Sequence, residues 1–342
     1  MSKGNFCCLI GTSLVAVIVL GGCAGSNTIP SPTIIWPPLE VESPGAVAWV
    51  GGFSEVKPGG MGRIFRAVAG EEQSNSRWRF RRPTAVAVHG RRIAVVDGGS
   101  GSVVLADTDG RHASVLDLPD GYLPVSVAVS KDGAGWFVAD GPTGEVRRFD
   151  HQGRAAGLVR AQGEITRCGG IAAAGNGDLL LTDVDAGQIL RLAPDGKVLA
   201  RAGGRGIEPG QFNRPTAIAE APDGTVWVLD ALNFRVQHLD SRLHHLGHFG
   251  THGDGSGHLA LPRGLAVDPD GHLYVSDAQF DLIQLFDPDG TLLLTVGRRG
   301  DGDGEFWSPA GLAFDSDGTL VVADAGNRRV QVLEYSRRRS GS

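Results

Sequence analysis

Four arginines occupy related positions along the chain and have the chemistry to bind an anion. Arg82, Arg167 and Arg214 each come directly before a proline or cysteine that opens an apolar run, and Arg263 follows such a proline. A guanidinium group binds a carboxylate or a phosphate through two parallel hydrogen bonds. We therefore predict an anion-binding set, which also includes the two threonines that match Arg263 in their own runs, Thr84 and Thr216. The alternative is that each arginine keeps its head in water along the rim or pairs with a neighbouring acid.

Histidines and acidic residues give two weaker candidates for a metal site. Five histidines lie between residues 244 and 258, but their spacing matches no structural zinc motif. Asp301, Asp303 and Glu305 could bind calcium in one loop, although their pattern is not that of an EF-hand. The chain has neither a Gly-x-Ser-x-Gly elbow nor a phosphate-binding loop. We therefore predict no metal, no cofactor and no catalytic residue.

The elements that position these residues follow from a repeat. Six aspartates, each after a short apolar run, are spaced by 43, 43, 47, 47 and 47 residues: Asp97, Asp140, Asp183, Asp230, Asp277 and Asp324. Repeats of this length that carry several short strands are typical of a β-propeller. The 52 glycines, the frequent Asp-Gly pairs and the lack of a long helical period favour the same class.

One repeat read in full predicts four strands. Residues 263–267 and 273–277 flank an Asp-Gly turn, and the apolar runs 282–287 and 291–296 follow. Four strands in each of six repeats predict an all-β fold, a six-bladed β-propeller of four-stranded antiparallel blades. The chain is mildly acidic, with a formal net charge of −6 and an isoelectric point near 5.9.

Two repeats carry a more specific pattern. Residues 230–236 and 324–330 both read Asp-x-x-Asn-x-Arg-Val, and the loops 209–215 and 304–309 precede them. These segments resemble the core of NHL repeats, and the resemblance covers residues 83–335 as six repeats. It is strong in the fourth and sixth. The asparagine is replaced in the other four repeats, by Ser100, Thr143, Ala186 and Phe280.

The six repeated aspartates are interpreted as structural. A side chain of this kind accepts hydrogen bonds from nearby backbone N–H groups in a turn, and asparagine also tolerates left-handed geometry. Cys168 stands where the other repeats have proline, and we expect a small buried residue at the start of a strand rather than a reactive thiol.

The ends of the repeat array predict how the ring closes. The last repeat has no fourth strand, whereas residues 46–51 resemble a fourth-strand run, so we expect the N-terminal strand to complete the last blade and remove an open edge. The propeller would then span residues 46–336. Residues 52–82 depart from the repeat and are expected to form a helical insertion, with Ile64, Phe65, Val68 and Ala69 on one face. A similar insertion after a Trp-Pro-Pro segment resembles that of a group of bacterial NHL lipoproteins.

The change of spacing from 43 to 47 residues predicts where ligands bind. The added residues lie in the connections between blades, which are expected on the face where the innermost strands begin. Three taller loops result, over residues 203–214, 250–261 and 297–308. We expect them to wall a cleft at the mouth of the channel, near the arginines and threonines named above.

The N-terminus predicts export and lipid anchoring. Lys3 precedes an apolar stretch of residues 9–20, and Leu20-Gly21-Gly22-Cys23 resembles a bacterial lipobox. We predict a signal peptide over residues 1–22, a lipid on Cys23 and a proline-rich tether over residues 23–45. Ala24 rather than aspartate follows the cysteine, which favours the outer membrane where the cell has one. Residues 337–342 are expected to form a solvated basic tail.

These features predict a binding or scaffold protein of the bacterial cell envelope. Its partner would be an envelope protein or a small, anionic ligand, and the domain is expected to be monomeric. The alternative is a metal-dependent hydrolase or lyase, because some six-bladed relatives have such activities. Binding to nucleic acid, known for some NHL propellers, disagrees with export and with the negative charge, since nucleic-acid binding requires a basic surface.

Overall fold

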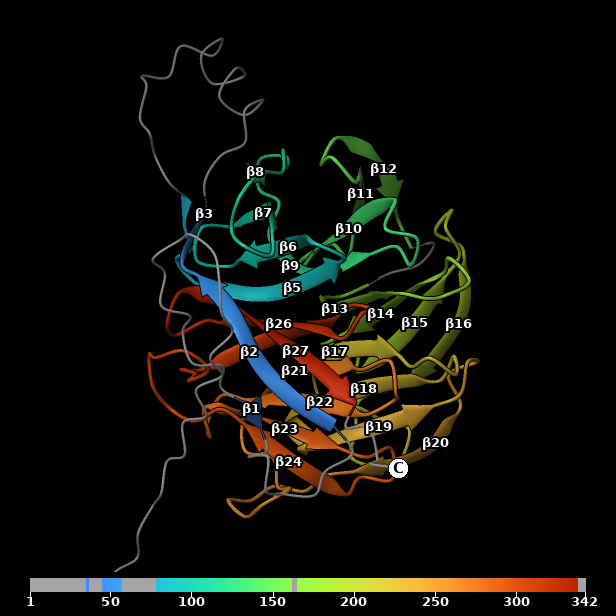
Figure 1. The fold of residues 1–342 in the computed structure, drawn as a ribbon. Coiled ribbons are helices and arrows are strands. Elements are labelled where there is room, and N and C mark those ends of the chain that lie inside the picture. Colours follow the sequence, from blue (N-terminus) through green and yellow to red (C-terminus); the bar gives the residue numbers. More distant parts are fainter. Residues whose placement is uncertain (1–34, 37–44, 57–77, 162–164, 338–342) are drawn as a thin grey trace, which may run out of the picture.

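The computed structural model describes residues 35–36, 45–56, 78–161 and 165–337. Within these residues the chain forms a ring of six antiparallel sheets, and the only helical element is the short 3-10 turn η1 at Ala231–Asn233 (Figure 1). The prediction of an all-β, six-bladed propeller is therefore confirmed. The signal peptide of residues 1–22 and Cys23 lie outside the described residues.

Each blade is one meander whose strands follow one another outwards from the centre. The first blade contains β5 Pro83–His89, β6 Arg92–Asp97, β7 Ser102–Asp107 and β8 Ser114–Val115. The second contains β9 Pro124–Val129, β10 Gly135–Asp140, β11 Val146–Asp150 and β12 Ala155–Val159. The third contains β13 Cys168–Ala173, β14 Leu179–Asp183, β15 Gln188–Leu192 and β16 Val198–Gly203. The next two are β17 Pro215–Glu220, β18 Val226–Asp230, β19 Arg235–Leu239 and β20 His245–Phe249; β21 Pro262–Val267, β22 Leu273–Asp277, β23 Leu282–Phe286 and β24 Leu292–Val296. The sixth contains β25 Pro309–Phe314, β26 Thr319–Asp324 and β27 Arg329–Arg337.

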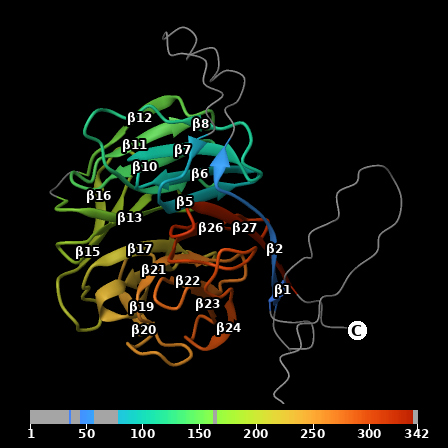
Figure 2. The same cartoon turned by 90° about the vertical axis from the view of Figure 1, so that its left-hand side faces the viewer.

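The N-terminal strand completes the sixth blade, as predicted. β2 (Gly45–Phe53) pairs antiparallel with β27 from Gly45 opposite Arg337 to Phe53 opposite Val330. A further strand, β1 (Ile35–Trp36), pairs with β2 opposite Ala48 and Val47, so residues 35–36 extend the sheet instead of forming the predicted tether. Figure 2 shows β2 and β1 along the outside of the ring.

The described ends of the predicted helical insertion are strands. Gly52 and Phe53 belong to β2, and β3 (Glu55–Val56) pairs with β4 (Trp78–Arg79) in a two-stranded sheet. Val56 and Phe80 are buried in an apolar cluster with residues of the first and sixth blades, which fixes both ends of the insertion to the ring. The helix predicted around Ile64 lies outside the described residues.

The apolar core lies between the blades. Each of six clusters of buried side chains joins two neighbouring blades. For example, Val86 and Val95 of the first blade pack with Val321 and Ala323 of the sixth. Because each blade packs on the next and the sixth packs on the first, the ring has no apolar end exposed to water. This arrangement holds the innermost strands in place around the axis.

Glycine allows the innermost strands to approach one another closely near the centre. A Cβ on Gly264 would lie 2.2 Å from the carbonyl oxygen of Ala310, and a Cβ on Gly311 would lie 2.7 Å from the Cα of Ala85. Only a residue without a side chain fits at such positions. The innermost strands of the fifth, sixth and first blades are therefore in direct backbone contact.

Candidate functional site

We call the side of the ring at which the six innermost strands begin the start face. Its geometry is set by the six repeated aspartates, which are all buried. Each carboxylate accepts a hydrogen bond from the backbone N–H of a residue just before an innermost strand. Asp97 accepts from Arg82 at 2.7 Å, for example, and Asp183 from Arg167 at 3.2 Å. These contacts fix the backbone at the start of each innermost strand, and in the first and third blades that backbone belongs to Arg82 and Arg167.

The fourth and sixth blades share one complete hydrogen-bond network around the aspartate. In the fourth, Asp230 accepts from Asn233 Nδ2 at 2.8 Å, from Arg235 Nε at 2.9 Å and from Gln237 Nε2 at 2.9 Å. The sixth blade repeats these bonds with Asp324, Asn327, Arg329 and Gln331. The same arginine also donates to carbonyl oxygens of the preceding loop, at Gln211 and Glu305 respectively, so the network ties the loop to the blade.

The other blades reach the same turn by different contacts. Ser100 Oγ donates to Asp97 Oδ2 at 2.9 Å and Thr143 Oγ1 donates to Asp140 Oδ2, so a hydroxyl replaces the asparagine amide. The residue with left-handed geometry comes one position after the asparagine. The expectation that asparagine is favoured because it tolerates this geometry is therefore wrong. This later position has a φ of 54° to 69° in all six blades: Gly101, Gly144, Gly187, Phe234, Asp281 and Arg328. Asparagine is favoured for its amide donor rather than for its backbone.

The four predicted arginines all belong to the start face, but they differ in their partners. Arg167 Nη2 pairs with Asp185 Oδ1 at 3.2 Å, so its charge is balanced within the protein. Among the described residues, the guanidinium groups of Arg82, Arg214 and Arg263 form no ion pair and no hydrogen bond. Arg214 also has a φ of 59°, in the left-handed region that side chains rarely adopt. Within the described residues, the start face therefore presents three arginines without a counterion.

The charge of Arg82 acts on Arg263, whose strand lies on the other side of the sixth blade. Partial burial of Arg263 and the positive charge of Arg82 both hold the pKa of Arg263 below its ordinary value. Of the two predicted threonines, Thr84 Oγ1 donates to the carbonyl of Val96 at 3.4 Å, whereas Thr216 Oγ1 is buried without a partner among the described residues. Two like charges close together and unpaired favour the binding of an anion between them.

Exposed apolar side chains also lie on the start face. Five of the large apolar side chains that remain exposed lie at strand starts or in the loops of this face: Leu123, Ile207, Leu232, Leu261 and Trp307. Leu261 directly precedes β21, and Trp307 precedes β25 by two residues. The alignment of strand starts already places apolar residues on this face. Because an apolar residue is also expected in a buried strand, the residue type alone could not show that these side chains are exposed.

The tall loops are attached to the core by their middle residues. Phe212, Leu259 and Phe306 are fully buried, and each of the three loops closes with a parallel bridge: Arg205 with Phe212, His252 with Leu259, Arg299 with Phe306. The loops end at Arg214, Leu261 and Ser308, so they do lie on the start face. The cleft between them stays a prediction.

The residues considered for metal binding have other contacts. Among the described residues, no group of three or more His, Cys, Asp or Glu side chains is arranged to hold a metal ion. Glu305 accepts from Arg298 at 2.9 Å and from the backbone N–H of Gly302 at 3.1 Å, and these bonds lower its pKa. His258 Nδ1 accepts from the backbone N–H of Gly255 at 3.1 Å. Cys168 is buried, and burial raises the pKa of its thiol to about 12, as expected for a packing residue.

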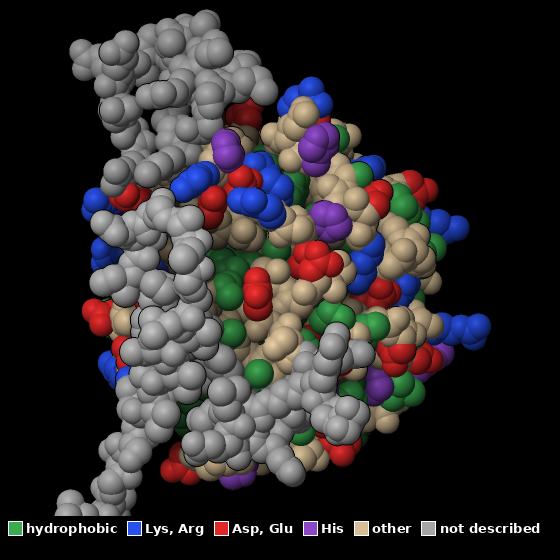
Figure 3. Space-filling view, in the orientation of Figure 1, with side chains coloured by type: hydrophobic (Ala, Val, Ile, Leu, Met, Phe, Trp, Pro, Cys, Tyr) green, Lys and Arg blue, Asp and Glu red, His purple; other side chains and the backbone are tan. Residues whose placement is uncertain are grey.

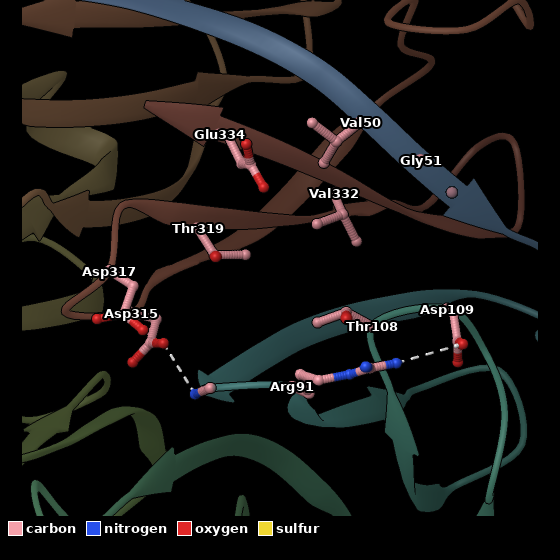
Figure 4. A pocket seen from close by; sticks show the side chains of 12 residues that line it. Val50, Gly51, Arg91, Thr108, Asp109, Asp315, Asp317, Thr319, Val332 and Glu334 are labelled. Carbon is pink, nitrogen blue, oxygen red and sulfur yellow. Dashed lines mark hydrogen bonds and ion pairs between the residues drawn. The ribbon is translucent and has the colours of Figure 1, made fainter. Parts of the chain in front are cut away.

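A cavity of about 610 Å³ lies where β2 and β27 meet the turns of the first blade (Figure 4). Its charges largely contact groups of the protein itself. Asp315 accepts from the backbone N–H of Gly90 at 2.8 Å, and Arg91 pairs with Asp109 at 3.6 Å. Figure 3 shows basic, acidic and histidine side chains interspersed over β5 to β10, so that region has no patch of a single sign. We therefore place the candidate site on the start face and not in this cavity.

Comparison with known proteins agrees with this geometry. A model of the NHL repeat matches residues 259–279 and 306–333. The last two blades are therefore similar to NHL repeats. The match includes the sixth repeat, which has the Asp-x-x-Asn-x-Arg-Val pattern, and the fifth, whose asparagine is replaced. The fourth blade lies outside the match, although its hydrogen-bond network around the aspartate is complete. No curated protein matches the chain.

Solved structures with the same architecture are distant in sequence. A protein of unknown function from Bacteroides thetaiotaomicron is 18% identical with a TM-score of 0.62, over 83% of this chain and 76% of that one. A streptogramin B lyase is 14% identical with a TM-score of 0.57, over 75% and 94%. An auxiliary nutrient binding protein from Bacteroides thetaiotaomicron is 14% identical with a TM-score of 0.56, over 75% and 69%. At these identities the likeness shows a shared fold and no more.

The described residues were searched for a helix that could span a membrane. None of their helical segments has the length and apolar character that a membrane span requires. The predicted lipid attachment at Cys23 concerns residues outside the described part of the chain.

Proposed function

We propose that this chain is a binding propeller of the bacterial cell envelope whose start face takes an anionic ligand. The observation that carries the proposal is the group formed by Arg82, Arg214 and Arg263, which have no counterion among the described residues. Arginine is well suited to carboxylates and phosphates because its planar donors match two oxygen atoms. The aspartates behind the strand starts fix the backbone from which these side chains extend. A rigid scaffold lowers the cost of ordering the site when a ligand binds.

Support also comes from a structural neighbour of the same architecture. One of the solved propellers is named as an auxiliary nutrient binding protein, so this fold is used for binding in at least that protein. A lyase shares the fold too, but the start positions of the innermost strands here contain no histidine or carboxylate. We therefore prefer binding to the alternative of a metal-dependent hydrolase or lyase.

The proposal is tested by anion titration of a double variant. We expect the unmodified propeller to bind inorganic pyrophosphate by isothermal titration calorimetry, and Arg214→Ala with Arg263→Ala to weaken binding at least about tenfold, since each charge-assisted hydrogen bond contributes roughly 1.5 to 3 kcal/mol. The matched control is Arg91→Ala with Arg242→Ala, two exposed arginines away from the start face. Equal affinity of the double variant and the unmodified protein would remove the arginines from the site.

The location at the envelope rests on the lipobox-like segment that ends in Cys23. We propose that a lipid on this cysteine anchors the propeller. Cys23→Ser in the full chain is expected to move the protein from the membrane fraction to the soluble fraction and to abolish incorporation of labelled fatty acid. A variant that stays in the membrane fraction and still incorporates label would contradict lipidation at this residue.

A further inference from the structure

One sector of the start face combines charge with exposed apolar surface. It consists of the strand starts of the fifth, sixth and first blades, with Leu261 and Arg263 in the fifth, Trp307 in the sixth and Arg82 in the first. Backbone contacts join these three innermost strands without a gap, since Gly264 lies against Ala310 and Gly311 against Ala85. The four side chains therefore belong to one continuous stretch of the rim.

The two arginines of this sector interact through their like charges. Among the described residues, neither guanidinium forms an ion pair or a hydrogen bond. Partial burial of Arg263 is the larger cause of its lowered pKa, and repulsion by Arg82 adds to it. Of the other two arginines, Arg214 belongs to the fourth blade, outside this sector, and Arg167 is paired with Asp185. An anion between Arg82 and Arg263 would relieve their repulsion and satisfy two sets of donors.

The apolar side chains of the sector stay in water at a considerable cost. Trp307 is 51% exposed and Leu261 is 40% exposed. A Cβ on Gly326 would lie 2.6 Å from the Trp307 ring, so the indole packs against the turn of its own blade and is held on this face. A ligand with an apolar part would cover the exposed half of these side chains and remove that surface from water. Sites for small molecules combine apolar lining with a few polar groups in this manner.

We propose that Arg82 and Arg263 hold the anionic head of an amphiphilic ligand whose apolar body lies on Leu261 and Trp307. This inference rests on the proposed function and adds the ligand class and the sector. The shared chemistry is a carboxylate or phosphate joined to an aromatic or aliphatic group. Two arginine forks accept either head, because both present paired oxygen atoms.

The test is calorimetric titration of the propeller with four probes: phenyl phosphate, benzoate, inorganic phosphate and acetate. Each aromatic anion is expected to bind at least about tenfold more tightly than its plain counterpart, a difference that corresponds to about 1.4 kcal/mol. Tighter binding of benzoate assigns a carboxylate head, and tighter binding of phenyl phosphate assigns a phosphate ester. Arg82→Met and Arg263→Met should each weaken both aromatic probes about tenfold, with Arg91→Met unchanged as the matched control.

A second pair of variants separates the apolar contribution from the charge. Leu261→Ser and Trp307→Ser are expected to remove the preference for aromatic probes and to leave inorganic phosphate binding unchanged, whereas Leu246→Ser, on an exposed outer strand, should have no effect. Equal affinities for aromatic and plain anions would overturn the apolar body and leave the proposed function standing. Sensitivity to Arg214→Met but not to Arg82→Met or Arg263→Met would overturn the clamp. Absence of binding by all four probes would end both the inference and the proposed function.

Discussion

Replacing Asp230 by alanine should lower the free energy of unfolding by about 3 to 5 kcal/mol, the cost typical of removing one partner from a buried ion pair. The carboxylate is fully buried and accepts from the backbone N–H of Asn213 at 2.6 Å as well as from Arg235, Gln237 and Asn233. Its loss leaves the Arg235 guanidinium, which is 8% exposed, without a counterion. The measurement is the midpoint of urea unfolding, with the slope of the transition compared between variants.

The control for Asp230→Ala is an exposed aspartate outside the six buried ones. Asp289 lies in an exposed Asp-Gly turn of the fifth blade and accepts from the backbone N–H of Thr291 at 2.8 Å. Asp289→Ala should leave the unfolding midpoint almost unchanged. If Asp230→Ala and Asp289→Ala shifted the midpoint by the same small amount, the network around Asp230 would not hold the blade to its loop.

Removing residues 46–52 should cause the second large effect, a marked fall in melting temperature together with aggregation. These residues form most of β2, the strand that completes the sixth blade. Their loss exposes the edge of β27 and the apolar cluster that contains Val47 and Leu333. An open strand edge pairs readily with other chains, so light scattering should rise with protein concentration. The measurement is thermal unfolding followed at several protein concentrations.

Two point variants in the same strand give a sharper comparison. Val47 is fully buried, whereas Val50 is 46% exposed at the irregularity between Trp49 and Gly51. Val47→Asp should destabilise the fold by about 3 kcal/mol or more, because it places a carboxylate in an apolar cluster. Val50→Asp should be close to neutral. Equal effects of the two variants, or an unchanged melt of the truncated chain, would contradict closure of the ring by β2.

The architecture was predictable because a blade is specified by local patterns. The spacing of Asp97 to Asp324 reflects a turn that each repeat must form, and the run at residues 46–51 has the alternation of a fourth strand. Strand β1 was not predictable: Ile35–Trp36 is a two-residue strand among prolines, and its pairing with β2 depends on an edge that exists only in the folded ring. Propensity in so short a segment carries little information.

The places of the candidate residues at the strand starts were predictable, but their contacts were not. The repeat placed Arg82, Arg167, Arg214 and Arg263 on one face, and the structure has them there. The pairing of Arg167 with Asp185 depends on side-chain reach between two turns of one blade, which spacing does not reveal. The exposure of Trp307 likewise depends on the path of the tall loop, whose buried residue is its neighbour Phe306. Contacts of this kind belong to tertiary structure and leave no period in the sequence.

The most direct test of the central claim is a crystal structure of the propeller with phenyl phosphate at a concentration well above its measured Kd. We predict that the phosphate group lies between the guanidinium groups of Arg82 and Arg263 on the start face, with the ring against Leu261 and Trp307. A ligand bound in the cavity beside β2, or an empty start face at a concentration that saturates the protein in solution, would contradict the account.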